Sequence, residues 1–224
     1  MKNFGNVLVL GDSYSTFRGC IPSDNNSYYP NHDVDVFEKT WWGSLIKQTN
    51  SNLVLNESYS GSAVSYYGWA NLGSELDPIK TSFITRVENL IDKGFFKENK
   101  IDTIFVCAGT NDLWIARDAK RSFGEVKYSD IKEEDLYYFY PAFARLLELL
   151  TSQIDSENII ILFNDMFLCR PDFLENQIEI CKGFNVKYLQ LKEIDKTDGH
   201  PNANGMQAIK NQIIKAFIEG ENNE

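Results

Sequence analysis

Strand-like and helix-like segments alternate along the whole chain, and this alternation limits the possible fold more than any other feature. Apolar, β-branched runs predict five strands, at Asn6–Leu10, Leu53–Asn56, Thr103–Ala108, Ile159–Phe163 and Val186–Leu191. The first, third and fourth runs are almost continuously apolar, as expected for strands buried on both faces of a parallel sheet. Helical patterns lie between the runs, at Trp41–Thr49, Ser82–Lys93, Asp135–Thr151, Pro171–Lys182 and Asn202–Ile218. The alternation predicts a doubly wound α/β sandwich with a parallel sheet.

Length and charge narrow the class of protein further. The chain has 224 residues, and we expect residues 1–224 to form a single domain. Its formal net charge of −10 argues against nucleic acid or an anionic membrane as a partner, because no basic face could dominate. No stretch approaches the roughly 18 apolar residues of a membrane span. The apolar run near the N-terminus is too short for a signal peptide, so we expect a cytoplasmic protein, or one whose leader has been removed.

Two long segments interrupt the α/β rhythm. Both Gly19–Lys39 and Leu113–Glu134 are polar with scattered aromatic residues, and we expect them to be loops. Loops of this length in a compact domain are usually functional or disordered.

Four short motifs carry the residues that are able to take part in catalysis: GDSYS at Gly11–Ser15, SGS at Ser60–Ser62, GTND at Gly109–Asp112 and DGHPN at Asp198–Asn202. The first three follow the ends of predicted strands. Because open α/β sheets bind ligands at the carboxyl ends of their strands, we expect the motifs to meet in space. Together they offer a serine, a glycine amide, a side-chain amide and a histidine. These groups are typical of an acyl-transfer site, with a nucleophile, two oxyanion donors and a general base.

Each motif alone also has an ordinary structural explanation. Ser13 fits a helix N-cap, Gly61 fits a small-residue turn, and Asn111 fits an Asx turn. His200 fits a surface loop, although its position just before a helix would disfavour the imidazolium and keep a general base neutral. It is the combination of all four in one chain that favours the catalytic interpretation.

The four motifs resemble those of the SGNH (GDSL-type) hydrolase family. Ser13, Gly61, Asn111 and His200 match the four residues that name the family, in the same order. The resemblance implies a flavodoxin-like, three-layer α/β/α fold with about five parallel strands. It also implies a Ser-His-Asp hydrolase without metal or cofactor, in which the amides of Ser13 and Gly61 and the side chain of Asn111 form the oxyanion hole.

One position departs from the family pattern. The family places its aspartate three residues before the histidine, where this chain has Thr197. The nearby carboxylates are Asp198 and Asp195, and we predict Asp198 as the third catalytic residue by a narrow margin. A backbone carbonyl that orients a Ser-His dyad is the remaining alternative.

These observations predict a serine esterase that hydrolyses a carboxylic ester through an acyl-enzyme intermediate. Polar loops with interspersed aromatics, and no long apolar stripe, favour a short acyl group such as an O-acetyl ester on a carbohydrate. Tyr14, Tyr66 and Trp114 are the predicted substrate contacts. The alternative function is a catalytically idle domain that binds a sugar or acyl ligand at the same edge. The oligomeric state is left open.

Overall fold

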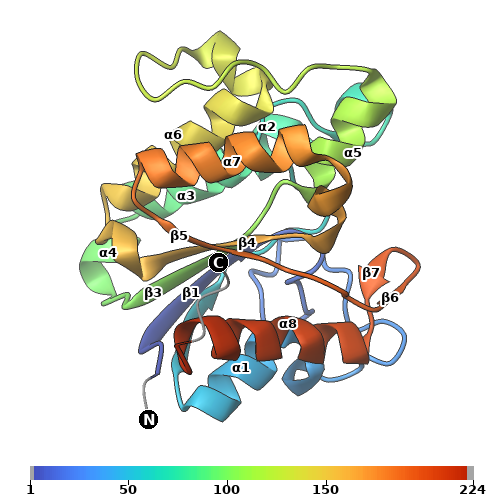
Figure 1. Cartoon of the computed structure of the whole chain (residues 1–224), viewed down its shortest axis with the longest axis vertical. Coiled ribbons are helices and arrows are strands. Elements are labelled where there is room, and N and C mark those ends of the chain that lie inside the picture. The colour runs from blue at the N-terminus through green and yellow to red at the C-terminus, as the bar shows by residue number, and fades with distance from the viewer. Residues whose placement is uncertain (1–2, 221–224) are drawn as a thin grey trace.

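A five-stranded parallel sheet forms the centre of the structure, a computed structural model that describes residues 3–220 (Figure 1). The strands follow the order β2-β1-β3-β4-β5. This is the flavodoxin-like order, whose topological switch point lies between β1 and β3. Their bounds are β1 Asn6–Gly11, β2 Asn52–Asn56, β3 Thr103–Cys107, β4 Ile159–Phe163 and β5 Lys187–Gln190. The predicted α/β/α fold and its five strands are therefore confirmed.

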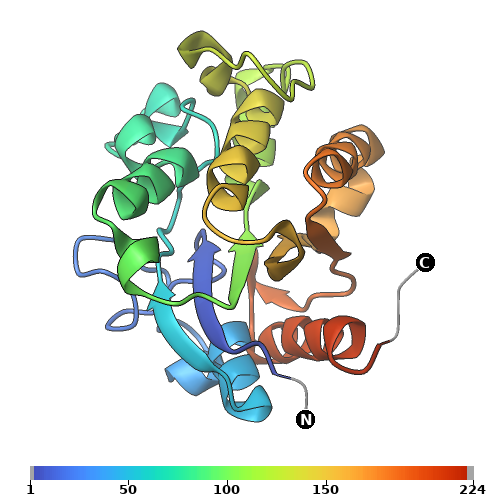
Figure 2. The ribbon, with the colours of Figure 1, turned by 90° about the vertical axis from the view of Figure 1, so that its left-hand side faces the viewer.

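Helices cover both faces of this sheet, as Figures 1 and 2 show. On one face lie α1 (Trp41–Thr49) and α8 (Ala203–Phe217). The other face carries α3 (Phe83–Asp92), α6 (Phe139–Thr151) and α7 (Pro171–Gly183). Shorter helices are α2 Pro78–Thr81, α4 Phe95–Glu98 and α5 Thr110–Ala119. Single 3-10 turns occupy Phe37–Lys39, Trp69–Leu72, Glu133–Tyr137, Ser156–Asn158 and Asp165–Cys169.

Side-chain alternation within the strands divides the core in two. In β1, Leu8 and Leu10 pack under α3 and α6, whereas Val7 and Val9 pack under α1 and α8. All four side chains are at most 1% exposed. Successive residues of a strand point to opposite faces, so a strand covered on both sides must be apolar at every position. This explains the continuous apolar runs in the sequence.

Polar side chains cap the N-termini of the two helices on one face of the sheet, α1 and α8. The Thr40 side chain accepts a hydrogen bond from the amide of Gly43 and caps α1. Asn202 caps α8 in the same way through the amide of Gly205. Such caps satisfy backbone donors that have no partner within the helix. The cap at Asn202 also places the start of α8 directly after His200.

The segment Leu113–Glu134 differs from the loop that we expected. Helix α5 covers Thr110–Ala119, so the GTND motif itself begins a helix. Its buried face includes Leu113, Ile115 and Ala116, a short pattern that tertiary packing stabilises more than propensity does. In Gly19–Lys39, by contrast, the only regular elements are the turn at Phe37–Lys39 and a bridge between Asn31 and Val34.

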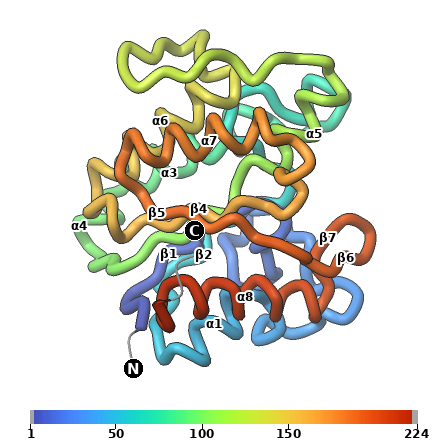
Figure 3. The backbone as a smooth tube through the Cα atoms, in the orientation of Figure 1, coloured from blue at the N-terminus to red at the C-terminus, as the bar shows by residue number. Residues whose placement is uncertain are grey.

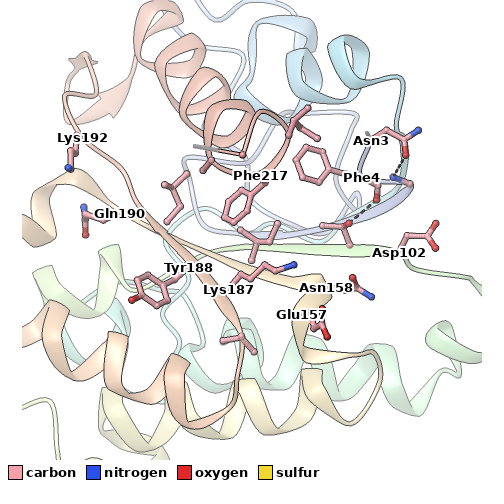
Figure 4. A pocket seen from close by; sticks show the side chains of 18 of the residues that line it. Asn3, Phe4, Asp102, Glu157, Asn158, Lys187, Tyr188, Gln190, Lys192 and Phe217 are labelled. Carbon is pink, nitrogen blue, oxygen red and sulfur yellow. Dashed lines mark hydrogen bonds between the residues drawn. The ribbon is translucent and has the colours of Figure 1, made fainter. Parts of the chain in front are cut away.

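A groove of about 1050 Å³ runs along the edge strand β5 (Figure 4). It is lined by Phe4, Asp102, Asn158, Lys187 and Phe217, among others. Most of these residues lie at the amino ends of the strands, opposite the edge where the four motifs gather. Lysine on an edge strand discourages pairing with another chain. Because it lies at the opposite ends of the strands, the groove is separate from the candidate site.

Within residues 3–220, no helix combines the length and apolar character needed to cross a membrane.

Candidate active site

Ser13 stands on a tight turn that follows β1. A Cβ atom at Gly11 would lie 2.4 Å from the Cβ atom of Ser15, so only glycine permits this turn. The amide of Ser15 closes the turn on the carbonyl of Asp12 at 3.0 Å. Ser13 is 8% exposed, and its hydroxyl lies at the carboxyl edge of the sheet, beside the switch point between β1 and β3.

His200 reaches Ser13 from a small hairpin formed by β6 (Lys196–Thr197) and β7 (His200–Pro201). The two turn residues, Asp198 and Gly199, have φ angles of 49° and 77°. Asp-Gly is the dipeptide that such a left-handed two-residue turn prefers, and this signal in the sequence would have predicted the hairpin. The imidazole Nε2 lies 2.9 Å from Ser13 Oγ.

The other nitrogen of the imidazole faces a backbone carbonyl. His200 Nδ1 lies 3.1 Å from the carbonyl oxygen of Asp198. The Asp198 carboxylate instead contacts His32 Nε2 at 3.1 Å, and its side chain is 76% exposed. The predicted contact of that carboxylate with the imidazole is therefore wrong, because the left-handed turn directs the carbonyl inward and the side chain outward. Among the described residues, His200 Nδ1 bonds the Asp198 carbonyl and not Asp195, whose own carbonyl accepts the amide of Asn202.

This geometry determines the tautomer of His200. A carbonyl oxygen only accepts hydrogen bonds, so Nδ1 must carry the proton. Nε2 then presents its lone pair to the Ser13 hydroxyl, as a general base requires. Burial lowers the pKa of His200 below its usual 6.5, which favours the neutral imidazole.

Three tyrosines hold the His200 hairpin in place. The ring of Tyr28 stacks on the imidazole with centroids 3.6 Å apart and an interplanar angle of 11°. The hydroxyl of Tyr14 donates to the carbonyl of Gly199 at 2.8 Å, and that of Tyr29 donates to the carbonyl of Pro201 at 2.6 Å. Figure 3 shows the hairpin beside the blue loop that contains Tyr28 and Tyr29. The long loop 19–39 thus supports the site, a role that its composition alone did not reveal.

Two of the predicted oxyanion donors, Gly61 and Asn111, lie on neighbouring segments, and the third is the amide of Ser13 on the nucleophile turn. Gly61 has a φ of 86°, which favours glycine at this position. The side-chain amide of Asn111, at the start of α5, donates from Nδ2 to the carbonyl of Ser62 at 2.9 Å. Its Oδ1 accepts from Trp69 Nε1 at 2.8 Å. A carboxamide nitrogen carries two N–H groups, so one remains available to a ligand.

Asp112 ties these two segments together. Its carboxylate accepts the amides of Val64 and Ser65 at 2.9 and 3.0 Å, and the Ser65 hydroxyl at 2.8 Å. Burial raises the pKa of this carboxyl group, whereas the three hydrogen bonds oppose the rise. The loop after Gly61 is therefore held directly against the helix that carries Asn111.

A buried arginine links the same loop to the nucleophile turn. Arg86 donates to the carbonyls of Glu57, Thr81 and Gly11, and to the Ser62 hydroxyl. Burial lowers its pKa to about 10, so it stays charged at neutral pH. Nothing in the sequence around Arg86 indicated this role, because its partners come from three other segments.

The three predicted substrate contacts have different surroundings. Tyr14 is 4% exposed and donates its hydroxyl hydrogen bond to Gly199, and its role as a substrate contact stays a prediction. Tyr66 is 8% exposed and packs edge-on against Tyr137, and its role as a substrate contact also stays a prediction. Trp114 is half-buried on α5 with the Arg117 guanidinium 4.0 Å above its ring, and its role stays a prediction.

Asp12, directly before Ser13, is a fully buried carboxyl group. Its Oδ1 accepts the amide of Tyr14 at 3.0 Å, whereas its Oδ2 has no hydrogen-bond partner among the described residues. Burial raises its pKa from 3.8 to about 7. A protonated Oδ2 fits this environment better than a charged one.

We expect Asp12 to make the stability of the protein depend on pH. The folded state binds the proton more tightly than the unfolded chain, so stability falls as the pH rises from about 4 to about 7. With about 1.4 kcal/mol per pKa unit, the full loss is about 4 kcal/mol. Asp12→Asn should remove it, and urea unfolding at pH 5 and pH 8 measures the change. From pH 5 to pH 8 the wild type should lose about 2–3 kcal/mol of unfolding free energy that the variant keeps. If the two proteins show the same pH profile, the pKa of Asp12 is not raised.

Fold and site together define an ester hydrolase of the α/β/α class. The sequence matches the GDSL-like lipase/acylhydrolase family over residues 5–217, and the chain belongs to this family. Among the described residues, no group of three His, Cys, Asp or Glu side chains is placed to hold a metal ion.

Solved structures agree with this assignment. A protein from Bacteroides ovatus described as a GDSL-like lipase is 33% identical, with a TM-score of 0.81 over 97% of this chain and 99% of its own. A similarly described protein from Bacteroides uniformis is 34% identical, with a TM-score of 0.82 over 96% of both chains. A carbohydrate acetylesterase from Sinorhizobium meliloti shares the fold at 12% identity, with a TM-score of 0.58 over 96% of this chain and 99% of its own. A comparison with curated proteins gives no match.

Proposed function

We propose that the protein hydrolyses short acyl esters, with an O-acetyl group on a carbohydrate as the favoured substrate, through a Ser13–His200 dyad. The observation that carries this proposal is the contact of 2.9 Å between His200 Nε2 and Ser13 Oγ, with Nδ1 held by a carbonyl. The nucleophile and its base are in hydrogen-bond reach, and the base is oriented by a third group. This is the arrangement that activates a serine hydroxyl.

The reaction follows from the atoms in place. Ser13 Oγ attacks the ester carbonyl carbon while His200 Nε2 takes the hydroxyl proton. The oxyanion of the tetrahedral intermediate accepts hydrogen bonds from the amides of Ser13 and Gly61 and from Asn111 Nδ2. The intermediate collapses as Nε2 returns its proton to the leaving alcohol. Water, deprotonated by Nε2, then attacks the acyl-enzyme, and a second collapse releases the acid and restores Ser13.

A carbonyl and an aromatic ring replace the usual carboxylate beside the histidine. The Asp198 carbonyl dipole stabilises the imidazolium that forms during each step. The Tyr28 ring, stacked on the imidazole at 3.6 Å, adds an attraction between a cation and an aromatic face. Both groups act without a buried negative charge.

We expect the Asp198 carboxylate to be nearly dispensable. Asp198→Asn keeps the backbone carbonyl on Nδ1, so kcat/KM should stay within about threefold of wild type, because only an exposed ion pair with His32 is lost. Asp195→Asn and the double variant should behave alike. Steady-state kinetics on a chromogenic acetate ester measures this. A loss of about 10³-fold in Asp198→Asn would restore the carboxylate to the mechanism.

The substrate class has its own test. The carbohydrate acetylesterase from Sinorhizobium meliloti shares the fold, which makes an acetylated sugar a reasonable substrate. Acetylated xylo-oligosaccharides and nitrophenyl esters of acetate, butyrate and octanoate should be compared, with Ser13→Ala as the blank. We expect the acetyl esters to be turned over fastest. A preference for octanoate would contradict the short acyl group. Saturable sugar binding with no turnover would favour the idle binding domain, which the missing carboxylate partner makes the second candidate.

A further inference from the structure

Trp69 lies beside two of the three predicted donors of the oxyanion hole, Gly61 and Asn111. It begins the 3-10 turn Trp69–Leu72, which follows the SGS motif in the chain. Its Nε1 lies 2.8 Å from Asn111 Oδ1. Its Cδ1 lies 3.9 Å from the position that a Cβ atom would take at Gly61. The indole therefore packs beside one donor and hydrogen-bonds the other.

The hydrogen bonds of Asn111 admit only one orientation of its carboxamide. An indole N–H only donates and the Ser62 carbonyl only accepts. Rotating the amide by half a turn would place the NH₂ group against the indole N–H and Oδ1 against the carbonyl oxygen. Both contacts would then be repulsive. Without the indole N–H, the Ser62 carbonyl would be the single hydrogen bond selecting the orientation.

We propose that Trp69 is a positioning residue of the oxyanion hole, whose N–H orients the Asn111 carboxamide and strengthens its remaining N–H as a donor. A hydrogen bond to the oxygen of an amide polarises the group and makes its N–H groups better donors. The proposal rests on the proposed role of Asn111 as an oxyanion donor. Trp69 hydrogen-bonds Asn111, whereas Ser13 hydrogen-bonds His200.

The test removes the indole N–H and keeps the ring. Trp69→Phe, and replacement of Trp69 by 3-benzothienylalanine, which keeps the shape of the indole, should each lower kcat by about 3- to 10-fold with KM within about twofold. Phenylboronic acid forms a tetrahedral adduct with an active serine, and its Ki should rise by the same factor as kcat falls. The isosteric variant separates loss of the N–H from loss of packing. If both variants keep the wild-type kcat and Ki, the proposal is wrong.

A double-mutant cycle with Asn111→Ala separates this proposal from the function on which it rests. Asn111→Ala should lower kcat by about 10²–10³-fold, as loss of one oxyanion donor does. In that background Trp69→Phe should change kcat by less than about twofold, because the group that it positions is gone. An unaltered kcat in Asn111→Ala would reject the role of Asn111. A full effect of Asn111→Ala together with an additive effect of Trp69→Phe would reject the role of Trp69 alone.

Discussion

Replacing Ser13 with alanine is expected to lower kcat for ester hydrolysis by about 10⁴-fold or more. The Ser13 hydroxyl is the proposed nucleophile, because its Oγ lies 2.9 Å from His200 Nε2. Without it, no acyl-enzyme forms, and only hydrolysis by water in the remaining site is left. The variant should fold normally, since it loses one side-chain hydrogen bond, to His200, worth about 1 kcal/mol.

Two measurements check this expectation. Nitrophenyl acetate turnover gives the rate, and intact-protein mass after treatment with a fluorophosphonate shows whether the serine is labelled. Wild type should gain one adduct and Ser13→Ala none. Ser60→Ala is the matched control. Ser60 bonds the carbonyl of Asn26 through its backbone amide, which the substitution keeps. A labelled serine in Ser13→Ala would move the nucleophile elsewhere.

Replacing His200 with alanine is expected to cost about as much, near 10⁴-fold in kcat. The serine then lacks a base, and the leaving alcohol lacks a proton donor. Added imidazole should restore part of the rate if it occupies the space beside Tyr28. The wild-type acid limb of kcat/KM should have an apparent pKa below 6.5, because burial lowers the pKa of His200 and the neutral ring is the active form.

His32→Ala provides the control for the second histidine. His32 contacts the exposed Asp198 carboxylate and not Ser13, so its loss should change kcat by less than about threefold. A large loss in His32→Ala would show that the contact between His32 and the Asp198 carboxylate supports the base. If the acid limb of the wild type has an apparent pKa above 6.5, the expected effect of burial on the pKa of His200 is wrong.

Much of the fold follows from local patterns in the sequence. A strand covered by helices on both faces must be apolar at every position, so runs such as Ile159–Phe163 identify buried parallel strands without further information. The positions of the motifs follow as well, since right-handed crossovers bring all carboxyl ends to one edge. Helix α5 was missed because its apolar face is short and begins inside a motif that resembles a turn.

The sequence by itself thus determined the sheet, its covering helices and the four motifs that meet at its edge, because each depends on periodicity or spacing within one short segment. The tertiary structure alone decided what surrounds those motifs. The Asp198 carbonyl faces His200 because two consecutive residues adopt positive φ. Trp69 meets Asn111, and Tyr28 stacks on His200, across 42 and 172 residues of chain. Such contacts depend on how distant segments cross, which no local pattern encodes.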